Sequence, residues 1–186
     1  MTIRIIGGEL KGRKLRTVPG MRTRPTADRV RESIFNILDD RVRNATILDL
    51  FAGTGAMGIE ALSRGAESVV FADDKPAALD TLKKNIKSCS LENRTRTIKW
   101  NILKNLNILR TQESVFDLVF IDPPYDKNMV QPTLSNLVRS QCLANGATLV
   151  IEHSAMEPIP ENPPGFNISD QRRYGKTLVS FLISVL

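Results

Sequence analysis

Residues 45–74, ATILDLFAGTGAMGIEALSRGAESVVFADD, decide the fold class of this chain. An apolar strand pattern over 45–51 is followed by a glycine-rich turn, a helical pattern over 57–64 and a second strand pattern over 68–72. A strand, a helix and a strand in this order predict a right-handed parallel βαβ unit. The stretch therefore predicts an α/β fold with helices covering a mostly parallel sheet.

The same alternation continues downstream. The patterns predict helices over 76–88 and 129–141, a short helical stretch near 102–110, and strands over 95–100, 116–121 and 147–152. A proline-rich connector then leads to two strand patterns, 167–174 and 177–184, that have no helix between them. These two strands predict an antiparallel hairpin at one edge of the sheet.

The N-terminal quarter differs from the rest of the chain. Short strand patterns over 3–6 and 14–18 predict a small β-hairpin, and Thr26 is a candidate N-cap for a helix. The apolar residues of that helix would be Val30, Ile34, Ile37 and Leu38. We expect residues 1–24 to form a basic extension and residues 25–186 to form the main domain.

Charge is distributed unevenly along the 186 residues, whose net charge is +6. Residues 1–43 hold eleven Lys/Arg and five Asp/Glu, whereas residues 44–186 hold fifteen of each. Such a basic arm favours a polyanionic partner, nucleic acid before a membrane surface, because no apolar-faced amphipathic segment accompanies it. The alternative is a solvated basic face without a partner.

Cysteine and histidine are scarce. Cys89 and Cys142 lie far apart, and His153 is the one histidine, so the sequence predicts neither a disulfide framework nor a metal site. We expect packing roles for both cysteines and a hydrogen-bonded or exposed state for His153. No apolar run approaches the ~18 residues of a membrane span. These features predict a protein of the reducing cytoplasm with no membrane association, and we expect a monomer.

The glycine loop after the first strand allows two ligands. Residues 53–58, GTGAMG, satisfy GxGxxG, and Asp73 at the end of the second strand could bind a ribose, as in a nicotinamide dehydrogenase. Asp49, at the end of the first strand, would however repel a pyrophosphate. A ligand with an ammonium and a sulfonium group, such as S-adenosylmethionine, would tolerate that carboxylate. A tight turn without a ligand is the remaining interpretation.

Asp122-Pro123-Pro124-Tyr125 follows the apolar strand FDLVFI directly. In an open α/β sheet, ligands bind beyond the carboxyl ends of the strands, so we expect the tetrapeptide to face the glycine loop. An exocyclic amine is a poor nucleophile until acceptors hold its hydrogens. The Asp122 carboxylate and the Pro123 carbonyl could hold both, while Tyr125 stacks on a planar substrate. A simple chain stop is the alternative.

The glycine loop and the tetrapeptide together resemble S-adenosylmethionine-dependent methyltransferases that modify exocyclic amines. The stretches Arg4–Gly8, Lys11–Arg13 and Arg24–Asn36 further resemble the bacterial 16S ribosomal RNA guanine-N2 methyltransferase family. The resemblance implies a Rossmann-like class I methyltransferase fold with a seven-stranded sheet. It also implies transfer of one methyl group to the 2-amino group of a guanine, of the guanine-966 type, in the small ribosomal subunit or an assembly intermediate.

The resemblance assigns roles by position. The catalytic residues would be Asp122, Pro123, Pro124 and Tyr125. S-adenosylmethionine, and its product S-adenosylhomocysteine, would be bound without a metal by Asp49, Phe51, Ala52, Gly53, Thr54, Gly55, Asp73, Asn101 and Ile102. Asp73 stands where the family usually has Glu, and Asn101 where it usually has an aspartate that contacts the adenine amine. The RNA-binding residues would be Arg4, Lys11, Arg13, Arg22, Arg24, Arg29 and Arg31.

Other functions share parts of this pattern. An adenine-N6 DNA methyltransferase normally needs a recognition domain, and a protein-glutamine methyltransferase usually has Asn at the position of Asp122. A dehydrogenase has no use for the tetrapeptide or the basic arm. A non-catalytic RNA-binding protein needs neither Asp49 nor the tetrapeptide.

Overall fold

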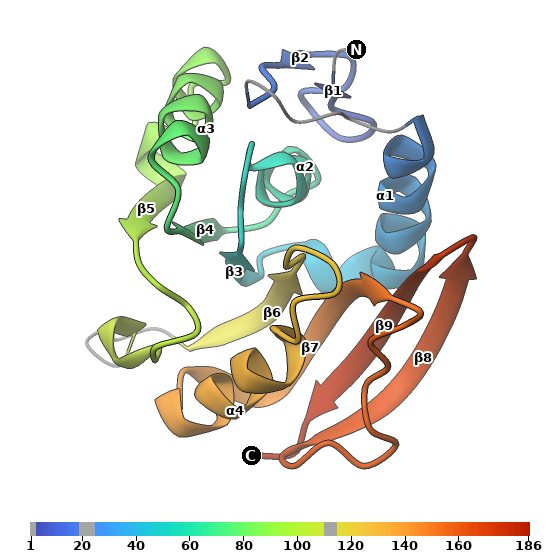
Figure 1. Ribbon diagram of the computed structural model, residues 1–186. Helices are drawn as coiled ribbons and strands as arrows, with labels where there is room; N and C mark the ends of the chain where they lie inside the picture. Colours follow the sequence, from blue (N-terminus) through green and yellow to red (C-terminus); the bar gives the residue numbers. More distant parts are fainter. Residues whose placement is uncertain (1–2, 19–24, 110–114) are drawn as a thin grey trace. The chain divides into compact units, whose positions relative to one another are not determined.

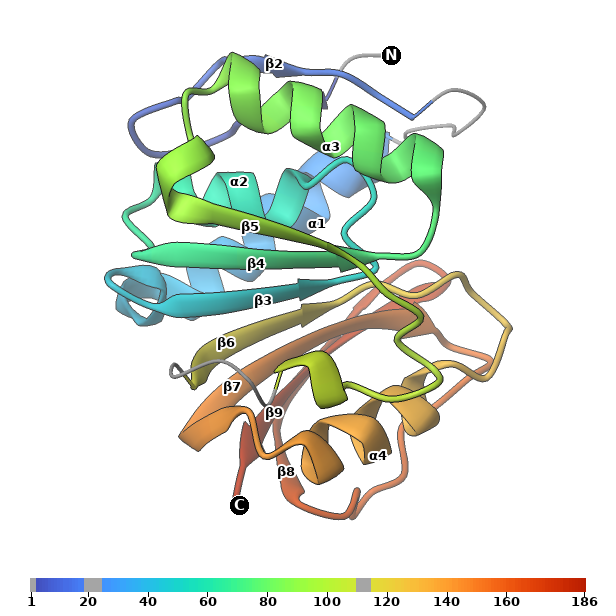
Figure 2. The ribbon, with the colours of Figure 1, turned by 90° about the vertical axis from the view of Figure 1, so that its left-hand side faces the viewer.

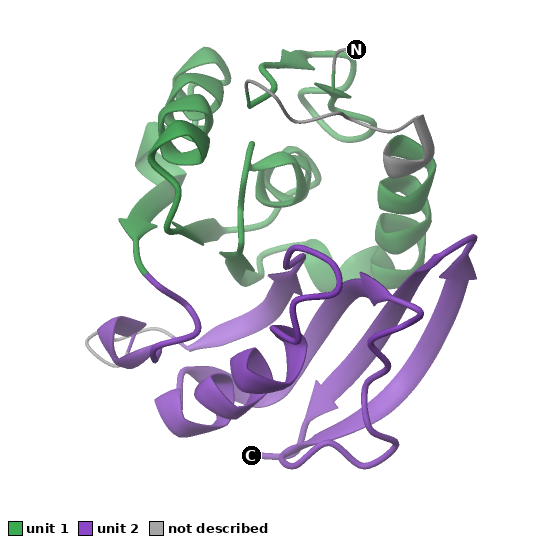
Figure 3. Cartoon of the chain, viewed as in Figure 1, with its two compact units in different colours: residues 1–100 green, residues 101–186 purple. Residues whose placement is uncertain are grey.

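The computed structural model describes residues 3–18, 25–109 and 115–186, and in the first helix it describes side chains from Asp28 onward (Figure 1). The chain divides into two compact units, residues 1–100 and residues 101–186 (Figure 3). The N-terminal extension falls inside the first unit. The predicted boundary between residues 24 and 25 stays a prediction.

The first unit contains the predicted parallel strands. Strands β3 (Thr46–Leu50), β4 (Ser68–Asp73) and β5 (Thr95–Lys99) pair in the order β5-β4-β3, all parallel, and lie side by side in Figure 2. Helix α2 (Ala56–Ser63) connects β3 to β4, and helix α3 (Pro76–Ser88) connects β4 to β5. The 3-10 turns η1 (Asp39–Val42) and η2 (Glu92–Arg94) precede β3 and β5. The alternation predicted from residues 45–100 is therefore confirmed.

The core of this unit is built from the apolar strand residues. Ile47, Leu48, Leu50 and Phe71 have no exposed surface. Helix α2 packs closely against them because Gly58 has no side chain: a Cβ there would overlap the Phe71 ring. The glycine that closes the GxGxxG pattern thus serves close helix-to-strand packing.

Helix α1 (Pro25–Leu38) begins at Pro25. The prediction that Thr26 is its N-cap is wrong, because the helix already includes Thr26. Proline suits the first helical position, since its φ is already helical and its missing N–H would have no intrahelical partner there. Val30, Ile34 and Leu38 are buried as the spacing predicted, and Phe35 joins them.

The N-terminal hairpin is shorter than its sequence pattern. Strands β1 (Ile3–Arg4) and β2 (Lys14–Leu15) pair antiparallel. Helix α2 anchors the turn that follows β1: the Glu60 carboxylate, fully buried, accepts the backbone N–H groups of Ile6 and Gly7, each at 2.8 Å. Ser63 Oγ donates to the Gly7 carbonyl at 2.6 Å and accepts the Leu10 N–H at 2.9 Å. The hairpin is held by specific polar contacts to one helix.

A glycine pair in the hairpin offers a matched test of this anchoring. Gly8 and Gly12 both have positive φ, 73° and 85°, so alanine is strained at either position. A Cβ on Gly8 would overlap the Ser63 carbonyl oxygen, whereas a Cβ on Gly12 meets nothing within 4 Å. We expect Gly8→Ala to lower the thermal midpoint several degrees more than Gly12→Ala, measured by differential scanning calorimetry. Equal losses would mean that α2 does not hold the hairpin tightly.

The second unit combines a parallel pair with an antiparallel hairpin. Strands β6 (Phe116–Ile121), β7 (Leu143–Ser154), β8 (Phe166–Tyr174) and β9 (Thr177–Ser184) pair in the order β6-β7-β9-β8. Helix α4 (Val130–Ser140) connects β6 to the parallel β7, and β8 and β9 form the predicted antiparallel edge hairpin. The predicted helical stretch near 102–110 is one 3-10 turn, η3 (Asn107–Leu109).

Strand β7 is longer than the predicted 147–152. It begins at Leu143, opposite Phe116, and passes through exposed Asn145 and Gly146 before the buried run starts. The register shifts between Phe116 and Leu118. The apolar pattern marks the buried strand alone, and backbone pairing continues beyond it across a bulge, where Gly146 has a φ of 75°.

His153 lies in the core of the second unit. It is 1 % exposed, and its Nδ1 lies 2.9 Å from the Glu157 carbonyl, so Nδ1 carries the proton and donates. Nε2 lies 2.8 Å from Ser180 Oγ, and that hydroxyl accepts from Gln171. The prediction of a hydrogen-bonded histidine is confirmed. Cys89 and Cys142 are free and buried, as expected for packing residues.

Candidate functional site

The glycine loop of the first unit has an unusual backbone. Phe51, Gly53 and Gly55 alternate through positive φ values of 60°, 56° and 78°. The φ of Gly55 favours glycine, and a Cβ there would overlap the end of the Leu82 side chain, whereas a Cβ on Gly53 meets only the Phe51 carbonyl, at 3.8 Å. Gly55 also precedes the first residue of α2. The loop therefore leaves open space at Gly53, next to a helix N-terminus.

Asp49 lies beneath this loop, at 3 % exposure. Its Oδ2 accepts the Gly58 N–H at 3.0 Å, and its other oxygen has no hydrogen-bond partner among the described residues. Burial raises the pKa of Asp49 to about 8, against the opposing effect of the Gly58 hydrogen bond, and the Asp73 charge raises it further. A buried carboxyl with one unused oxygen suits a cationic ligand group.

Asp73, at the end of β4, organises the loop. Its Oδ2 accepts the Gly53 N–H and its Oδ1 accepts the Lys75 N–H, both at 2.9 Å. A carboxylate has about four lone-pair positions, so acceptor capacity remains for a ribose hydroxyl. The predicted ribose role stays a prediction, and the structure adds a role in holding Gly53.

Asn85 is a residue of this site that sequence reasoning missed. It is fully buried on α3, and its Nδ2 donates to the Thr54 carbonyl at 2.9 Å and to the Arg16 carbonyl at 3.1 Å. Its Oδ1 accepts the Arg16 N–H at 2.8 Å. The available signal was an amide on the apolar face of a helix, between Leu82 and Ile86. One side chain thereby joins the glycine loop to the N-terminal arm, which is the basic extension of residues 1–24, described in the structure over residues 3–18.

The tetrapeptide belongs to the second unit and follows β6. Asp122 and Pro124 are exposed, Pro123 is buried and Tyr125 is half-buried. The Tyr125 hydroxyl donates to Glu152 Oε1 at 2.5 Å and lies 3.0 Å from Thr177 Oγ1. Burial raises the pKa of Tyr125, and the hydrogen bond to Glu152 raises it further, so the phenol stays neutral. The ring is thus held from β7 and β9.

Glu152 and Thr177 were not predicted as site residues. They lie 27 and 52 residues from Tyr125 in the sequence, and no motif includes them. Only the pairing of β7 with β9 brings them to one place.

Asn101 and Ile102 follow β5, at the start of the second unit. The Asn101 side-chain oxygen accepts the N–H groups of Leu103 at 3.0 Å and Lys104 at 3.3 Å, so it caps its own turn. Ile102 is buried, and its carbonyl accepts from Asn136 at 2.9 Å. Contact of this pair with an adenine stays a prediction, and the structure gives the Asn101 oxygen a competing role.

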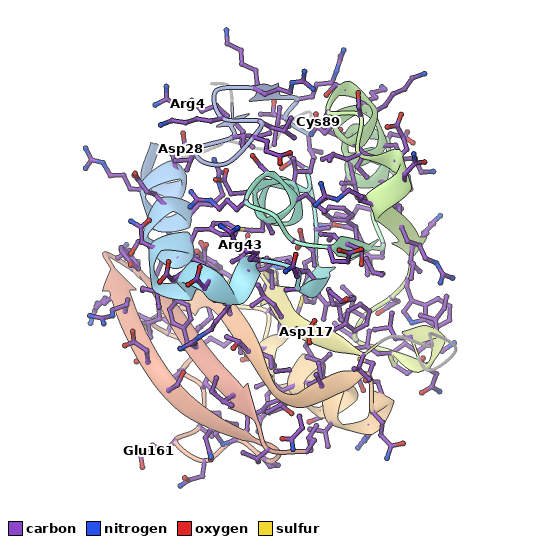
Figure 4. The ribbon with its side chains drawn as sticks, turned by 180° about the vertical axis from the view of Figure 1, so that it is seen from behind. Arg4, Asp28, Arg43, Cys89, Asp117 and Glu161 are labelled. Carbon is purple, nitrogen blue, oxygen red and sulfur yellow. The ribbon has the colours of Figure 1, made fainter. Side chains whose placement is uncertain are left out.

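The predicted RNA-binding residues fall into three groups. Arg4, Lys11, Arg13 and Arg29 are exposed, while Arg22 and Arg24 lie outside the described residues. Arg31 is 5 % exposed: its Nη2 donates to the Arg4 carbonyl and to Asp28, which lie close together in Figure 4, and its Nε is 3.7 Å from Glu60. Arg31 therefore has charge partners inside the protein, and its contact with RNA stays a prediction.

Two further properties of the described part of the chain bear on the site. No three His, Cys, Asp or Glu side chains in it gather as a metal site would require. None of its helices combines the length and apolar character needed to cross a bilayer.

Comparison with solved structures identifies the class of protein. The chain superposes on the ribosomal protein L11 methylase of Lactobacillus delbrueckii subsp. bulgaricus with a TM-score of 0.68 at 16 % identity, over 90 % of this chain and 83 % of that one. The Escherichia coli protein yhhF matches with a TM-score of 0.86 and 32 % identity over 99 % of this chain and 98 % of its own. The fold is that of the class I methyltransferases, with a mostly parallel seven-stranded sheet and an antiparallel edge, as predicted.

The family follows from the sequence match. The family model described as conserved hypothetical protein 95 matches residues 3–183, and the chain belongs to this family. Ribosomal RNA small subunit methyltransferase D of Escherichia coli is 33 % identical over 174 residues, which cover 94 % of this chain and 86 % of that protein. The resemblance found in the motifs is thereby confirmed at the level of the family.

Proposed function

We propose that this protein is a methyltransferase of ribosomal RNA that transfers a methyl group from S-adenosylmethionine to the exocyclic 2-amino group of a guanine in 16S rRNA, of the guanine-966 type. The observation that carries the proposal is the Asp122-Pro123-Pro124-Tyr125 segment, with Asp122 exposed after a buried strand and Tyr125 held by two partners. Family membership and the name of the Escherichia coli relative support ribosomal RNA as the acceptor.

The first unit offers features that suit S-adenosylmethionine. Asp49 presents an unused carboxylate oxygen to a cationic group, and Gly53 leaves open space at the loop. Asp73 retains acceptor capacity for a ribose hydroxyl. When bound, the cofactor supplies an electrophilic methyl group on a sulfonium sulfur.

The second unit offers the groups that activate the amine. In the proposed reaction the Asp122 carboxylate and the Pro123 carbonyl accept the two N2 hydrogens, which makes the nitrogen lone pair available for in-line attack. The N–C bond forms as the S–C bond breaks, and the methylated nitrogen then loses a proton to Asp122 or water. Tyr125, neutral and oriented by Glu152, supplies a face on which an unstacked guanine can lie.

Tritiated methyl transfer tests the function directly. The acceptors are small subunits that lack the modification, naked 16S rRNA, duplex DNA and a translation-factor protein. Label in rRNA that digests to N2-methylguanosine is the expected result, and comparison of particle with naked RNA identifies the substrate. Label only in DNA or protein, or no label despite bound cofactor, would overturn the proposal.

The raised pKa of Asp49 predicts proton release when the cofactor binds. With a pKa of about 8, Asp49 is mostly protonated at pH 7 in the free protein, and a bound cation favours its carboxylate. Calorimetry at pH 7 in buffers of different ionisation enthalpy should show release of nearly one proton, and affinity should rise as pH increases from 5 to 8. Asp49→Asn should abolish the release, and exposed Asp74→Asn should keep it. Persistent release in Asp49→Asn would contradict this role.

The salt dependence of RNA binding tests the N-terminal arm. Replacing Arg22 and Arg24 with glutamine should weaken binding of 16S rRNA. It should also reduce the slope of log K against log salt by roughly 1.5, because each lost phosphate contact contributes about 0.7 to 0.9. Filter binding between 50 and 300 mM salt measures the slope. An unchanged slope would remove these two residues from the RNA interface.

A further inference from the structure

Helix α3 of the first unit exposes a row of lysines, Lys83, Lys84 and Lys87. Lys87 lies four residues from Lys83 and three residues from Lys84, so these like charges are neighbours on the helix surface. Among the described residues none of the three lies within ion-pair distance of a carboxylate. Asp80 is the one exposed acid on this helix. The exposed face of this helix therefore carries an excess of positive charge, which suits an anionic partner.

The N-terminal arm lies along the same helix. Arg13 Nη1 donates to the Ser88 carbonyl at 2.6 Å, and the Arg16 backbone pairs in both directions with the Asn85 side chain. Figure 2 shows β2 beside α3. The exposed cations of the arm thus lie beside the helix that carries the three lysines. Together they are Lys11, Arg13, Lys14, Arg16, Lys83, Lys84 and Lys87.

We propose that the RNA-binding surface extends from the arm onto α3, where Lys83, Lys84 and Lys87 contact backbone phosphates of 16S rRNA. The inference rests on the proposed function and names a part of its substrate interface. Lysine binds phosphate as a flexible point charge, so a row of lysines can follow an RNA backbone without reading its sequence.

The composition of this surface favours RNA over a membrane. Surface-bound amphipathic helices insert large apolar side chains beside their basic residues. The large hydrophobic residues that are exposed in the described chain, from Leu103 to Leu186, all belong to the second unit. The lysine face of α3 therefore carries charge without an apolar anchor.

Asn85 connects this surface to the glycine loop. The same side chain that pairs with Arg16 also holds the Thr54 carbonyl. RNA bound along the arm and α3 would therefore be held in a defined relation to the loop within the first unit, so the surface positions the substrate as well as attracting it.

Glutamine substitution at Lys83, Lys84 and Lys87 together tests the proposal. We expect the slope of log K against log salt for 16S rRNA to fall by about 2, because each of the three lost phosphate contacts contributes about 0.7. We also expect the KM for RNA to rise about tenfold near physiological salt, with cofactor affinity unchanged. The matched control replaces Arg172, Arg173 and Lys176, exposed on the β8–β9 hairpin, with glutamine, and should alter neither quantity.

The outcomes separate this surface from the function itself. An unchanged slope in the α3 variant, while the wild type methylates rRNA, refutes the surface and leaves the function standing. An equal loss in the control also refutes it, since net charge alone would then explain the effect. If the wild type binds rRNA through these lysines but transfers no methyl group, the surface stands and the proposed function fails.

Discussion

Replacing Asp122 with alanine is expected to nearly abolish methyl transfer to rRNA, with a loss of about 10²- to 10³-fold, while cofactor affinity stays within a few-fold of wild type. The removed carboxylate is the proposed acceptor for one hydrogen of the guanine amine, and preorganised groups of this kind contribute about 10² to 10³ each. Asp122 follows the buried strand β6 and is itself exposed, so alanine leaves no cavity in the core. The loss should therefore appear in turnover rather than in stability.

A graded pair of variants strengthens this test. Asp122→Asn keeps one acceptor oxygen and should retain more activity than Asp122→Ala. Asp117→Asn changes an exposed carboxylate on the same strand and should retain full activity. Single-turnover methyl transfer and equilibrium binding of S-adenosylhomocysteine separate chemistry from binding. Full activity in Asp122→Ala would falsify the proposed mechanism.

Replacing Glu60 with alanine is expected to produce the largest loss of stability. Glu60 is fully buried and accepts the N–H groups of Ile6 and Gly7, and its carboxylate pairs with Arg64 at 2.8 Å and lies 3.7 Å from Arg31. Its removal leaves two donors without an acceptor and the buried Arg31 without one of its counter-charges. Breaking such a buried pair costs about 3–5 kcal/mol. The thermal midpoint should fall by roughly 10 °C, at about 2–4 °C per kcal/mol for a chain of this size.

Hydrogen exchange shows where the stability is lost. In Glu60→Ala the amides of Ile6 and Gly7 should exchange faster than those of strands β3 and β4. Glu60→Gln keeps the side-chain volume and one acceptor, so it should fold with an intermediate loss. Glu67→Gln, at an exposed site, should stay within about 0.5 kcal/mol of wild type. Unchanged protection at Ile6 and Gly7 in both Glu60 variants would contradict the anchoring role.

The elements that the sequence predicted well are those with local signals. The predicted helix over 76–88 matches α3, and the predicted strand over 116–121 matches β6, because apolar periodicity and flanking turn residues lie within the segment itself. Strand β7 was predicted too short because its first residues are paired without being a continuous apolar run. The predicted N-cap of α1 was also wrong, because the helix begins at Pro25 and already includes Thr26.

The residues of the candidate site also differ in whether a local sequence signal marks them. Asp49 and Asp73 lie at the ends of strands, and the glycine loop and the tetrapeptide follow strands directly, so motif spacing identified them without a structure. Asn85, Glu60 and Glu152 act on partners 27 to 69 residues away, and no local pattern marks them. For Arg31 the structure adds what the motif does not show: burial beside Glu60 gives its charge an internal partner, and its RNA contact stays a prediction.

The sequence by itself determined the fold class and the family, and it located the glycine loop and the tetrapeptide, because each rests on residues close together in the chain. Only the tertiary structure decided which charges are available to a partner. Residues 44–186 are neutral in total, yet α3 gathers three of their lysines beside the arm, while Arg31 of the basic N-terminal region is withdrawn into the protein. Net charge is a sum over the chain, whereas binding depends on which charged side chains are exposed near one another. The packing of the folded chain determines which side chains those are.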